Sequence, residues 1–385
     1  MINLNTYLEN KSYDGFKLNQ KQKEKLICLD RMFWSIAKMY HEDKPRYVKN
    51  ISEECDKFLS AYKSGVKYFP KLEFETESKY ATDGVIPKID SLIYEFRNFN
   101  CFLSKYYLEV LIAYKQMIKG CINPKETYPM FNAIRLQKPS IEMYELALKT
   151  LKEHPYKKVD KTVRDIDAKK AKQYIEDYLD ELDWDWDVQI KDNMQPRMAV
   201  GADKMSINKD GSFSEIDIEG LKAHEVQGHV GRRYYAQKTG LYLFVEGLLW
   251  RNTLDEGLAV WNSLNLVDKK KPNIMFNIAL KTVIAYKLND LDFYDLFDYI
   301  HKLVPTVPES IVFKTIIRFK RELRDCSIIG GNGDDMSYFV GYQLVKNMTD
   351  EERDDILKYN IGPGQIKDLP NIKKFFKLNK FKSLI

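Results

Sequence analysis

"LKAHEVQGHVGRRYY", residues 221–235, is the stretch that decides the fold of this chain. Its two histidines, His224 and His229, stand five residues apart, and Glu225 follows the first of them. On an ideal α-helix five residues separate two side chains by roughly 140°, so the imidazoles would face different sides. A single π-bulge absorbs one extra residue and brings both onto one face, and the backbone freedom of Gly228 makes that distortion less costly. If the two histidines act together, the spacing therefore requires a local π-type distortion.

The chemistry that uses such a pair is that of a catalytic zinc ion. A catalytic zinc takes three protein ligands and leaves one position for water, and imidazoles and carboxylates are suitable ligands. The H-E-x-x-H signature of zinc proteases holds two histidines and a glutamate that acts as general base, and "HEVQGH" differs from it by one residue in spacing. The competing interpretation is two ordinary histidines on a helix, and the motif alone does not decide between them. The other histidines are isolated, at His41, His154 and His301.

A third ligand is available farther along the chain. Two Glu-Gly-Leu triplets follow, one beginning at Glu246 and the other at Glu256. Either glutamate could lie on a downstream helix that faces the first, as in peptidases whose third zinc ligand is a distant glutamate. Spacing alone does not choose between them.

Short strands are expected just before the histidine-bearing helix. The alternation in "DWDVQIKD", residues 185–192, predicts a strand, and residues 197–211 predict a hairpin that ends in a Lys-Asp-Gly turn. Ser214 and Asp217 have the spacing of a helix cap, which places the start of the helix there. The residues expected on one face of the first strand are Trp186, Val188 and Ile190.

The first half of the chain has helical rather than strand-like spacing. Residues 21–41 and 89–120 each carry apolar residues at helical intervals, and the second run is expected to end at Gly120. A polar stretch around Pro155 marks the boundary between two parts, a helical N-terminal region over residues 1–155 and a zincin-like metallopeptidase domain over residues 156–385. The predicted fold class is α+β and mainly helical, with a small sheet packed on the zincin-like active-site helix.

Composition excludes several other classes of protein. A net charge of +5 is too small for 385 residues to predict nucleic-acid binding. No apolar run approaches the roughly 20 residues that a transmembrane helix needs, and the first residues do not resemble a signal peptide. The five cysteines are scattered without a C-x-x-C pair, which predicts reduced thiols and a cytoplasmic location.

The C-terminal stretch "NIKKFFKLNKFKSLI", residues 371–385, interleaves lysines with Phe and Leu. A basic amphipathic tail of this kind could dock on an acidic partner or a membrane surface. The alternative, which we favour, is a terminal helix that packs its apolar face on its own domain.

Several of these pieces, in this order, resemble the tyrosine/phenylalanine carboxypeptidase domain family. "HEVQGH" followed by "DEGLAVW" resembles the H-E-x-x-x-H and Q-E-G-L-A motifs of that family, which includes the microtubule-associated tyrosine carboxypeptidases of animals and bacterial proteins named for the QEGLA motif. The resemblance spans residues 186–341. "VQIKDNMQPRMAV", "RFKRELRD" and "GGNGDDMSYFVGY" resemble further family segments, and Gly247, nine residues before Glu256, favours Glu256 over Glu246.

The resemblance implies a zinc-dependent carboxypeptidase that removes a C-terminal residue, expected to be Tyr or Phe, from peptides or proteins. It implies Zn²⁺ as the cofactor, with His224, His229 and Glu256 as ligands and Glu225 as base. Tyr338 is a candidate donor to the oxyanion. The candidates for holding the substrate α-carboxylate with a guanidinium fork are Arg318, Arg321 and Arg197.

The chain departs from the family pattern at positions other than the expected ligands. Gln227-Gly228 replaces Gly-Thr, Asp255 replaces Gln, Arg321-Glu322 replaces Arg-Gly, and Asp334 replaces Lys. Two alternatives remain beside the carboxypeptidase. One is a zinc endo- or aminopeptidase, and the other is a non-enzymatic binding or regulatory protein that uses its helical N-terminal region for recognition.

Overall fold

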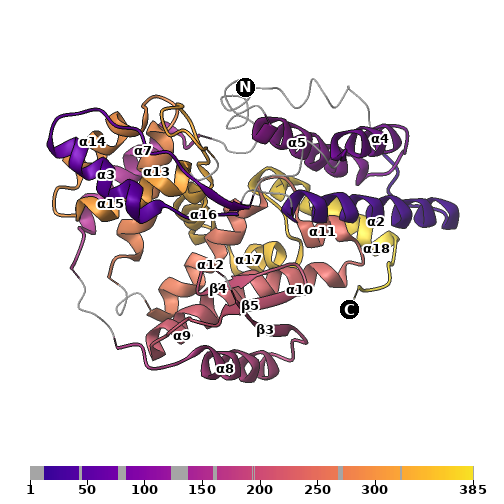
Figure 1. Cartoon of the computed structure of the whole chain (residues 1–385). Helices are drawn as coiled ribbons and strands as arrows, with labels where there is room; N and C mark the ends of the chain where they lie inside the picture. Colours follow the sequence, from indigo (N-terminus) through magenta and orange to yellow (C-terminus); the bar gives the residue numbers. More distant parts are fainter. Residues whose placement is uncertain are drawn as a thin grey trace. The chain divides into compact units, whose positions relative to one another are not determined.

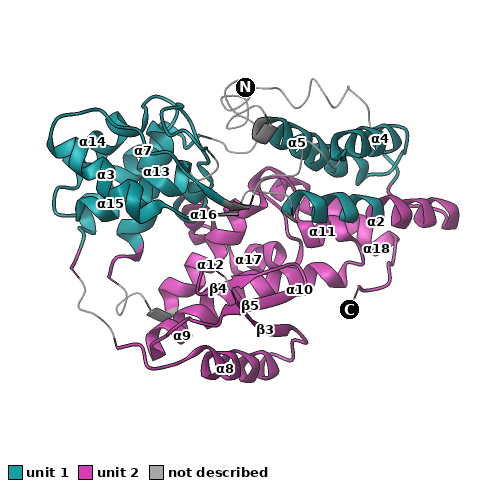
Figure 2. Ribbon diagram, viewed as in Figure 1, with its two compact units in different colours: residues 1–15, 32–156, 275–339 teal, residues 16–31, 157–274, 340–385 magenta. Residues whose placement is uncertain are grey.

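The computed structural model describes residues 13–42, 46–76, 84–122, 138–158, 163–192, 194, 196–267, 272–320 and 323–384 (Figure 1). Contacts divide the chain into two compact units, each assembled from segments that are distant in the sequence (Figure 2). The first unit comprises residues 1–15, 32–156 and 275–339, and the second comprises residues 16–31, 157–274 and 340–385. The linear division expected at residue 155 stays a prediction, because contacts alone do not establish which segments fold independently.

The first unit consists mainly of helices packed around aromatic side chains. At its centre the ring of Phe58 lies 5.0 Å from that of Phe293 and 4.7 Å from that of Phe297, and all three side chains are buried. Burial of such large apolar surfaces is the main stabilising contribution to a helical unit of this kind. Its elements are β1 (Arg46–Val48), α3 (Ile51–Lys63), β2 (Phe74–Thr76), α4 (Val85–Arg97), α5 (Ser104–Ile122), α7 (Ile141–Glu153), α13 (Ile274–Lys287), α14 (Phe293–Leu303), α15 (Glu309–Lys320) and the 3₁₀ turn η3 (Asp334–Met336).

One helical run predicted in the N-terminal half is two helices, α4 and α5, so that prediction was wrong in part. The Asn98 side chain donates to the Tyr94 carbonyl at 3.0 Å where α4 ends, and the Ser104 hydroxyl donates to the Phe99 carbonyl at 2.8 Å where α5 begins. Asn and Ser side chains compete for backbone partners in this way and interrupt helices. The apolar spacing continues across the interruption, which is why the sequence pattern did not reveal it.

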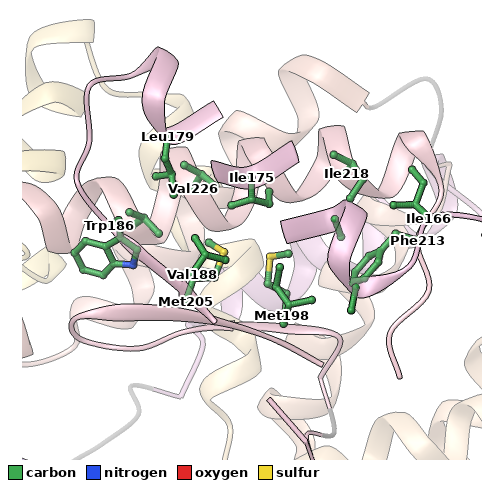
Figure 3. Close-up of a cluster of buried hydrophobic side chains, with 14 of the residues drawn as sticks. Ile166, Ile175, Leu179, Trp186, Val188, Met198, Met205, Phe213, Ile218 and Val226 are labelled. Carbon is green, nitrogen blue, oxygen red and sulfur yellow. The ribbon is translucent and has the colours of Figure 1, made fainter. Parts of the chain in front are cut away.

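The second unit holds the small sheet, whose strands lie in the order β3-β5-β4. Strand β3 (Asp187–Lys191) runs parallel to β5 (Lys204–Asn208), and β4 (Met198–Val200) pairs with β5 antiparallel, as the hairpin prediction requires. Helix α8 (Ala168–Glu181) and the histidine-bearing helical segment pack on this sheet. The fold is therefore α+β and mainly helical, as predicted. The buried side chains labelled in Figure 3 include Ile175, Leu179, Trp186, Val188, Met205, Phe213, Ile218 and Val226.

The predicted face of strand β3 is correct for two of its three residues. Trp186 and Val188 are buried, whereas Ile190 is 36% exposed. Because β3 is an edge strand of a three-stranded sheet, the core ends before Ile190.

The C-terminal segment packs its apolar side chains within the second unit. Helix α18 (Leu369–Leu378) buries Ile372 and Phe375, and the ring of Phe376 lies 5.2 Å from that of Phe244. This is the arrangement that we favoured for the basic tail. The other helices of the second unit are α9 (Glu215–Leu221), η1 (Lys222–Val230), α10 (Gly231–Lys238), α11 (Tyr242–Glu246), α12 (Arg251–Val267), α17 (Asp350–Lys358) and the 3₁₀ helix η4 (Pro363–Asp368).

Helices α2 (Gln20–Glu42) and α16 (Ser337–Lys346) contribute residues to both units, and the first residue of α13, Ile274, belongs to the second unit. No helix in the described part of the chain is both long enough and apolar enough to cross a membrane.

Candidate metal centre

The two histidines lie on a π-helix. Helix α9 begins at the predicted cap, where the Ser214 hydroxyl accepts from the Asp217 N–H at 3.2 Å and the Asp217 carboxylate accepts from the Ser214 N–H at 3.3 Å. It continues directly into η1, and at the end of η1 the N–H of Gly231 donates to the carbonyl of Val226, five residues earlier. The π-type distortion that the spacing requires is therefore present, and it extends over nine residues rather than one bulge.

The π-helix turns both imidazoles toward one carboxylate. Nε2 of His224 lies 3.5 Å from Oε2 of Glu256, and Nε2 of His229 lies 3.6 Å from the same oxygen. One ligand atom from each of these residues lies within 4.8 Å of the other two. Two atoms that each bind a tetrahedral zinc at about 2.0–2.1 Å are about 3.3 Å apart, so these separations suit a shared ion.

The donor atoms also have the chemistry that a divalent ion requires. Glu256 Oε2 is buried and accepts no hydrogen bond from any described residue. Nε2 of His224 and Nε2 of His229 lie 3.5 and 3.6 Å from it. Burial raises the pKa of the Glu256 carboxyl, but His229 and His224 lower it by more, so the carboxylate is charged. A buried carboxylate oxygen between two imidazoles is a suitable place for a cation.

The alternative glutamate lies elsewhere. Glu246 is the last residue of α11, and its Oε1 is 3.9 Å from Nη2 of Arg251. Among the described residues, Glu256 forms a group of three potential metal ligands with His224 and His229. Glu246 belongs to no such group of described residues. Of the two glutamates that spacing left open, the position of α12 brings Glu256 close to the two histidines.

Close packing of glycines sets the position of α12. A Cβ on Gly228 would lie 2.8 Å from the Cβ of Ala259, so η1 and α12 approach as closely as glycine allows. One residue after Glu256, a Cβ on Gly257 would lie 2.3 Å from the carbonyl carbon of Gly341. Contacts under 3.0 Å force a shift of the backbone, so α12 is held on both sides at the level of Glu256.

We expect Gly228→Ala to weaken the packing of η1 on α12. Overpacking of this kind costs about 1–3 kcal/mol, which exceeds or cancels the gain of about 1 kcal/mol from alanine's helix propensity. The thermal midpoint should fall and zinc affinity should fall with it, because α12 carries Glu256. Gly364→Ala is the matched control, since its Cβ would meet the Trp250 ring at an ordinary 3.7 Å. Equal zinc affinity in Gly228→Ala and wild type would contradict this account of the packing.

Each imidazole contacts a second side chain through its Nδ1 atom. Nδ1 of His224 lies 3.3 Å from Oγ of Ser263, whose hydroxyl donates to the Ala259 carbonyl at 2.8 Å. Oγ therefore accepts from Nδ1–H, which leaves the Nε2 lone pair directed at Glu256. Ser263 was not among the predicted site residues, although it stands seven residues, or two helical turns, after Glu256 and so shares its face of α12.

The partner of His229 is Asp255, whose Oδ1 lies 3.1 Å from Nδ1. Burial lowers the pKa of His229, but Asp255 and Glu256 raise it by more, so the net pKa is well above its usual value. Burial raises the pKa of Asp255, but His229, Arg233 and Arg232 lower it by more, so this carboxyl is charged. In the sequence, Asp255 is recognisable only as a departure from the family motif.

The predicted base, Glu225, is half-buried on η1 and directly follows His224. The predicted oxyanion donor, Tyr338, belongs to the first unit, where Nζ of Lys281 lies 4.2 Å from the centre of its ring. Arg321 lies outside the described residues.

The other two candidate arginines are held by aspartates. Nη1 and Nη2 of Arg197 contact Asp217 at 2.8 and 3.3 Å, and Nη1 also donates to the Ser212 carbonyl. In the first unit, Nε and Nη2 of Arg318 contact Asp335 at 2.6 and 3.1 Å. Both guanidinium forks already bind a carboxylate of this chain.

Comparison with known proteins places these residues in a family. The sequence model of the microtubule-associated tyrosine carboxypeptidase family matches residues 132–381, which include η1, α12 and every residue of the candidate centre. A search of curated proteins found no match. Because the family match covers more than half of the chain, the chain belongs to the microtubule-associated tyrosine carboxypeptidase family and is a carboxypeptidase.

Proposed function

We propose that this carboxypeptidase is a zinc enzyme that removes a C-terminal Tyr or Phe from peptides or proteins. The observation that carries the proposal is the convergence of one ligand atom each from His224, His229 and Glu256 within 4.8 Å of one another. Two imidazoles and one carboxylate are the ligand set of many catalytic zinc sites and leave a fourth position for water. Preference for an aromatic residue is proposed from the family, whose description names tyrosine.

His224, His229 and Glu256 would hold the ion, which supplies a Lewis acid that polarises the scissile carbonyl and lowers the pKa of a water molecule. Glu225 is proposed to take the proton from the attacking water and to pass it to the leaving amine as the peptide bond breaks. Tyr338 is proposed to donate a hydrogen bond to the oxyanion. No net proton is gained or lost, because Glu225 accepts one proton from the water and gives it to the leaving amine.

Recognition of the free α-carboxylate calls for a guanidinium fork. Arg197 and Arg318 each direct two nitrogens at an aspartate, which argues against both for this task. Arg321, the third arginine that the sequence suggested, lies outside the described residues, and we keep it as a candidate for holding the substrate carboxylate.

A pair of peptides tests the direction of cleavage. The purified protein should release free tyrosine from a peptide that ends in Tyr, and amidation of that C-terminus should remove nearly all activity, because the guanidinium then loses its anionic partner. Free amino acid is measured by mass spectrometry. Cleavage of both peptides at an internal bond would indicate an endopeptidase, and release of the N-terminal residue would indicate an aminopeptidase.

The same assay tests the metal and the preferred residue. Treatment with a zinc chelator should abolish release of tyrosine, and stoichiometric Zn²⁺ should restore it. Peptides that end in Phe should be cleaved, whereas otherwise identical peptides that end in Gly or Asp should be cleaved poorly. Full activity in metal-free protein would end the zinc proposal.

A further inference from the structure

We propose that Asp255 is a positioning residue of the metal site, and that the buried Arg232 and the partly buried Arg251 balance its charge. Its carboxylate fixes the ring of His229 so that Nε2 presents a lone pair to the ion. The inference rests on the proposed zinc site and adds a residue that is Gln in the family motif.

The geometry places Asp255 and Glu256 at opposite edges of one imidazole. Oδ1 of Asp255 lies 3.1 Å from Nδ1 of His229, while Oε2 of Glu256 lies 3.6 Å from Nε2 of the same ring. Both atoms are buried and neither makes a hydrogen bond with any described residue, so the 3.1 Å contact is a close approach of a carboxylate to a ring nitrogen rather than an aligned hydrogen bond. Two consecutive residues of α12 therefore determine how the ring is turned.

The contact matters because a neutral imidazole carries only one proton. A ring that binds metal through Nε2 must keep its proton on Nδ1, and a carboxylate facing Nδ1 stabilises that tautomer and that orientation. The corresponding partner of His224 is the neutral hydroxyl of Ser263. The charged partner of His229 should therefore contribute more to metal affinity than the hydroxyl does.

A buried carboxylate directly beside Glu256 needs compensating charge. Asp255 has a side chain that is 5% exposed, and Arg232 behind it is completely buried, with Nε at 3.7 Å from Oδ1. Arg251 approaches the other oxygen, with Nη1 at 3.5 Å from Oδ2. Burial lowers the pKa of Arg232 to about 10, which leaves it charged at neutral pH.

The hydrogen bonds of Arg232 point to the same role. Its Nη2 donates to the Ile361 carbonyl at 2.9 Å, whereas Nε and Nη1 make no hydrogen bond with the described residues. Charge balance with Asp255 explains why the guanidinium group of Arg232 is completely buried. The sequence carries no signal for this role, because Arg232 stands next to Arg233 in a basic pair of the kind that is usually solvated.

The test measures zinc affinity by competition with a chelator of known affinity, in the full chain. Asp255→Ala should raise the zinc dissociation constant by about 10- to 100-fold, as removal of a partner behind a metal-bound histidine typically does. Asp255→Asn and Asp255→Gln keep an acceptor for Nδ1–H and should lose less. At saturating zinc, kcat of these variants should rise toward the wild-type value, because the expected loss is in metal affinity.

Asp335→Asn is the control for loss of a buried aspartate. Asp335 is also buried and pairs with Arg318 and Lys281, both of which lie with it in the first unit. This variant should lower the thermal midpoint and leave zinc affinity unchanged. Wild-type affinity in Asp255→Ala, or an equal loss in Asp335→Asn, would overturn the inference. A wild-type protein that binds no zinc would instead overturn the proposed function.

Discussion

Glu256→Gln is expected to lose zinc affinity by about 100- to 1,000-fold. Zinc sites with four protein ligands bind with about 10–16 kcal/mol, so one ligand accounts for about 3–4 kcal/mol, which corresponds to that range. The amide keeps the size of the side chain but replaces the anionic oxygen that lies between His224 and His229. Zinc content after dialysis and the dissociation constant from chelator competition both measure the loss.

The second Glu-Gly-Leu triplet provides a matched control for this prediction. Glu246→Gln changes the same residue type in the same local sequence, but Glu246 contacts Arg251 rather than an imidazole. It should therefore keep zinc affinity close to that of wild type, although loss of a buried ion pair lowers its stability. If Glu246→Gln lost the metal and Glu256→Gln kept it, the assignment of the third ligand would be reversed.

Glu225→Gln is expected to lower kcat by about 10²- to 10⁴-fold and to leave zinc affinity nearly unchanged. General acid–base groups contribute about this much to catalysis, and the amide can neither accept the proton of the attacking water nor deliver it to the leaving amine. The expected pattern separates the base from the ligands, because Glu256→Gln loses metal and activity together. Steady-state kinetics on a Tyr-ending peptide, with zinc content measured on the same sample, gives both quantities.

Glu219→Gln is the corresponding control on the same helical run. Glu219 lies on α9, is exposed and pairs with Lys222 at 3.2 Å, so its loss should change neither kcat nor zinc content. Wild-type kcat in Glu225→Gln would exclude Glu225 as the base even if zinc were present. In that case the proposed mechanism fails, while the metal site itself stands.

The features that follow from local sequence were predictable. The cap at Ser214 and the π-type distortion between His224 and His229 are determined by residues within a few positions of one another. Backbone geometry alone links a five-residue spacing to a π-helix when both side chains must face the same way. Local physical chemistry was therefore sufficient for the histidine-bearing segment.

The choice of the third glutamate was not predictable from residue spacing. Glu246 and Glu256 sit in similar triplets, and what separates them is the close contact between Gly228 and Ala259. Gly228 and Ala259 lie far apart in the sequence, so the contact between them produces no periodic pattern of residues that could be recognised. Family resemblance, rather than residue spacing, favoured Glu256.

The arginines illustrate a second reason why sequence patterns fail. Arg197 and Arg318 stand in segments that suggested substrate binding, yet Asp217 and Asp335 occupy their guanidinium groups. These partners lie 20 and 17 positions away along the chain. The sequence does not distinguish an arginine that binds a ligand from one that is paired with an aspartate of the same chain.

The way the second unit is assembled from distant segments has a consequence for synthesis of the protein. Asn379 accepts from the N–H of Leu18 at 2.9 Å, a contact that spans 361 positions, and it also donates to the Phe16 carbonyl. This contact cannot form until residue 379 has left the ribosome, long after η1 and α12 have been made. Contacts between distant segments also form slowly. Nascent chains should therefore expose apolar side chains such as Phe244, against which Phe376 of α18 packs, until α18 has been made.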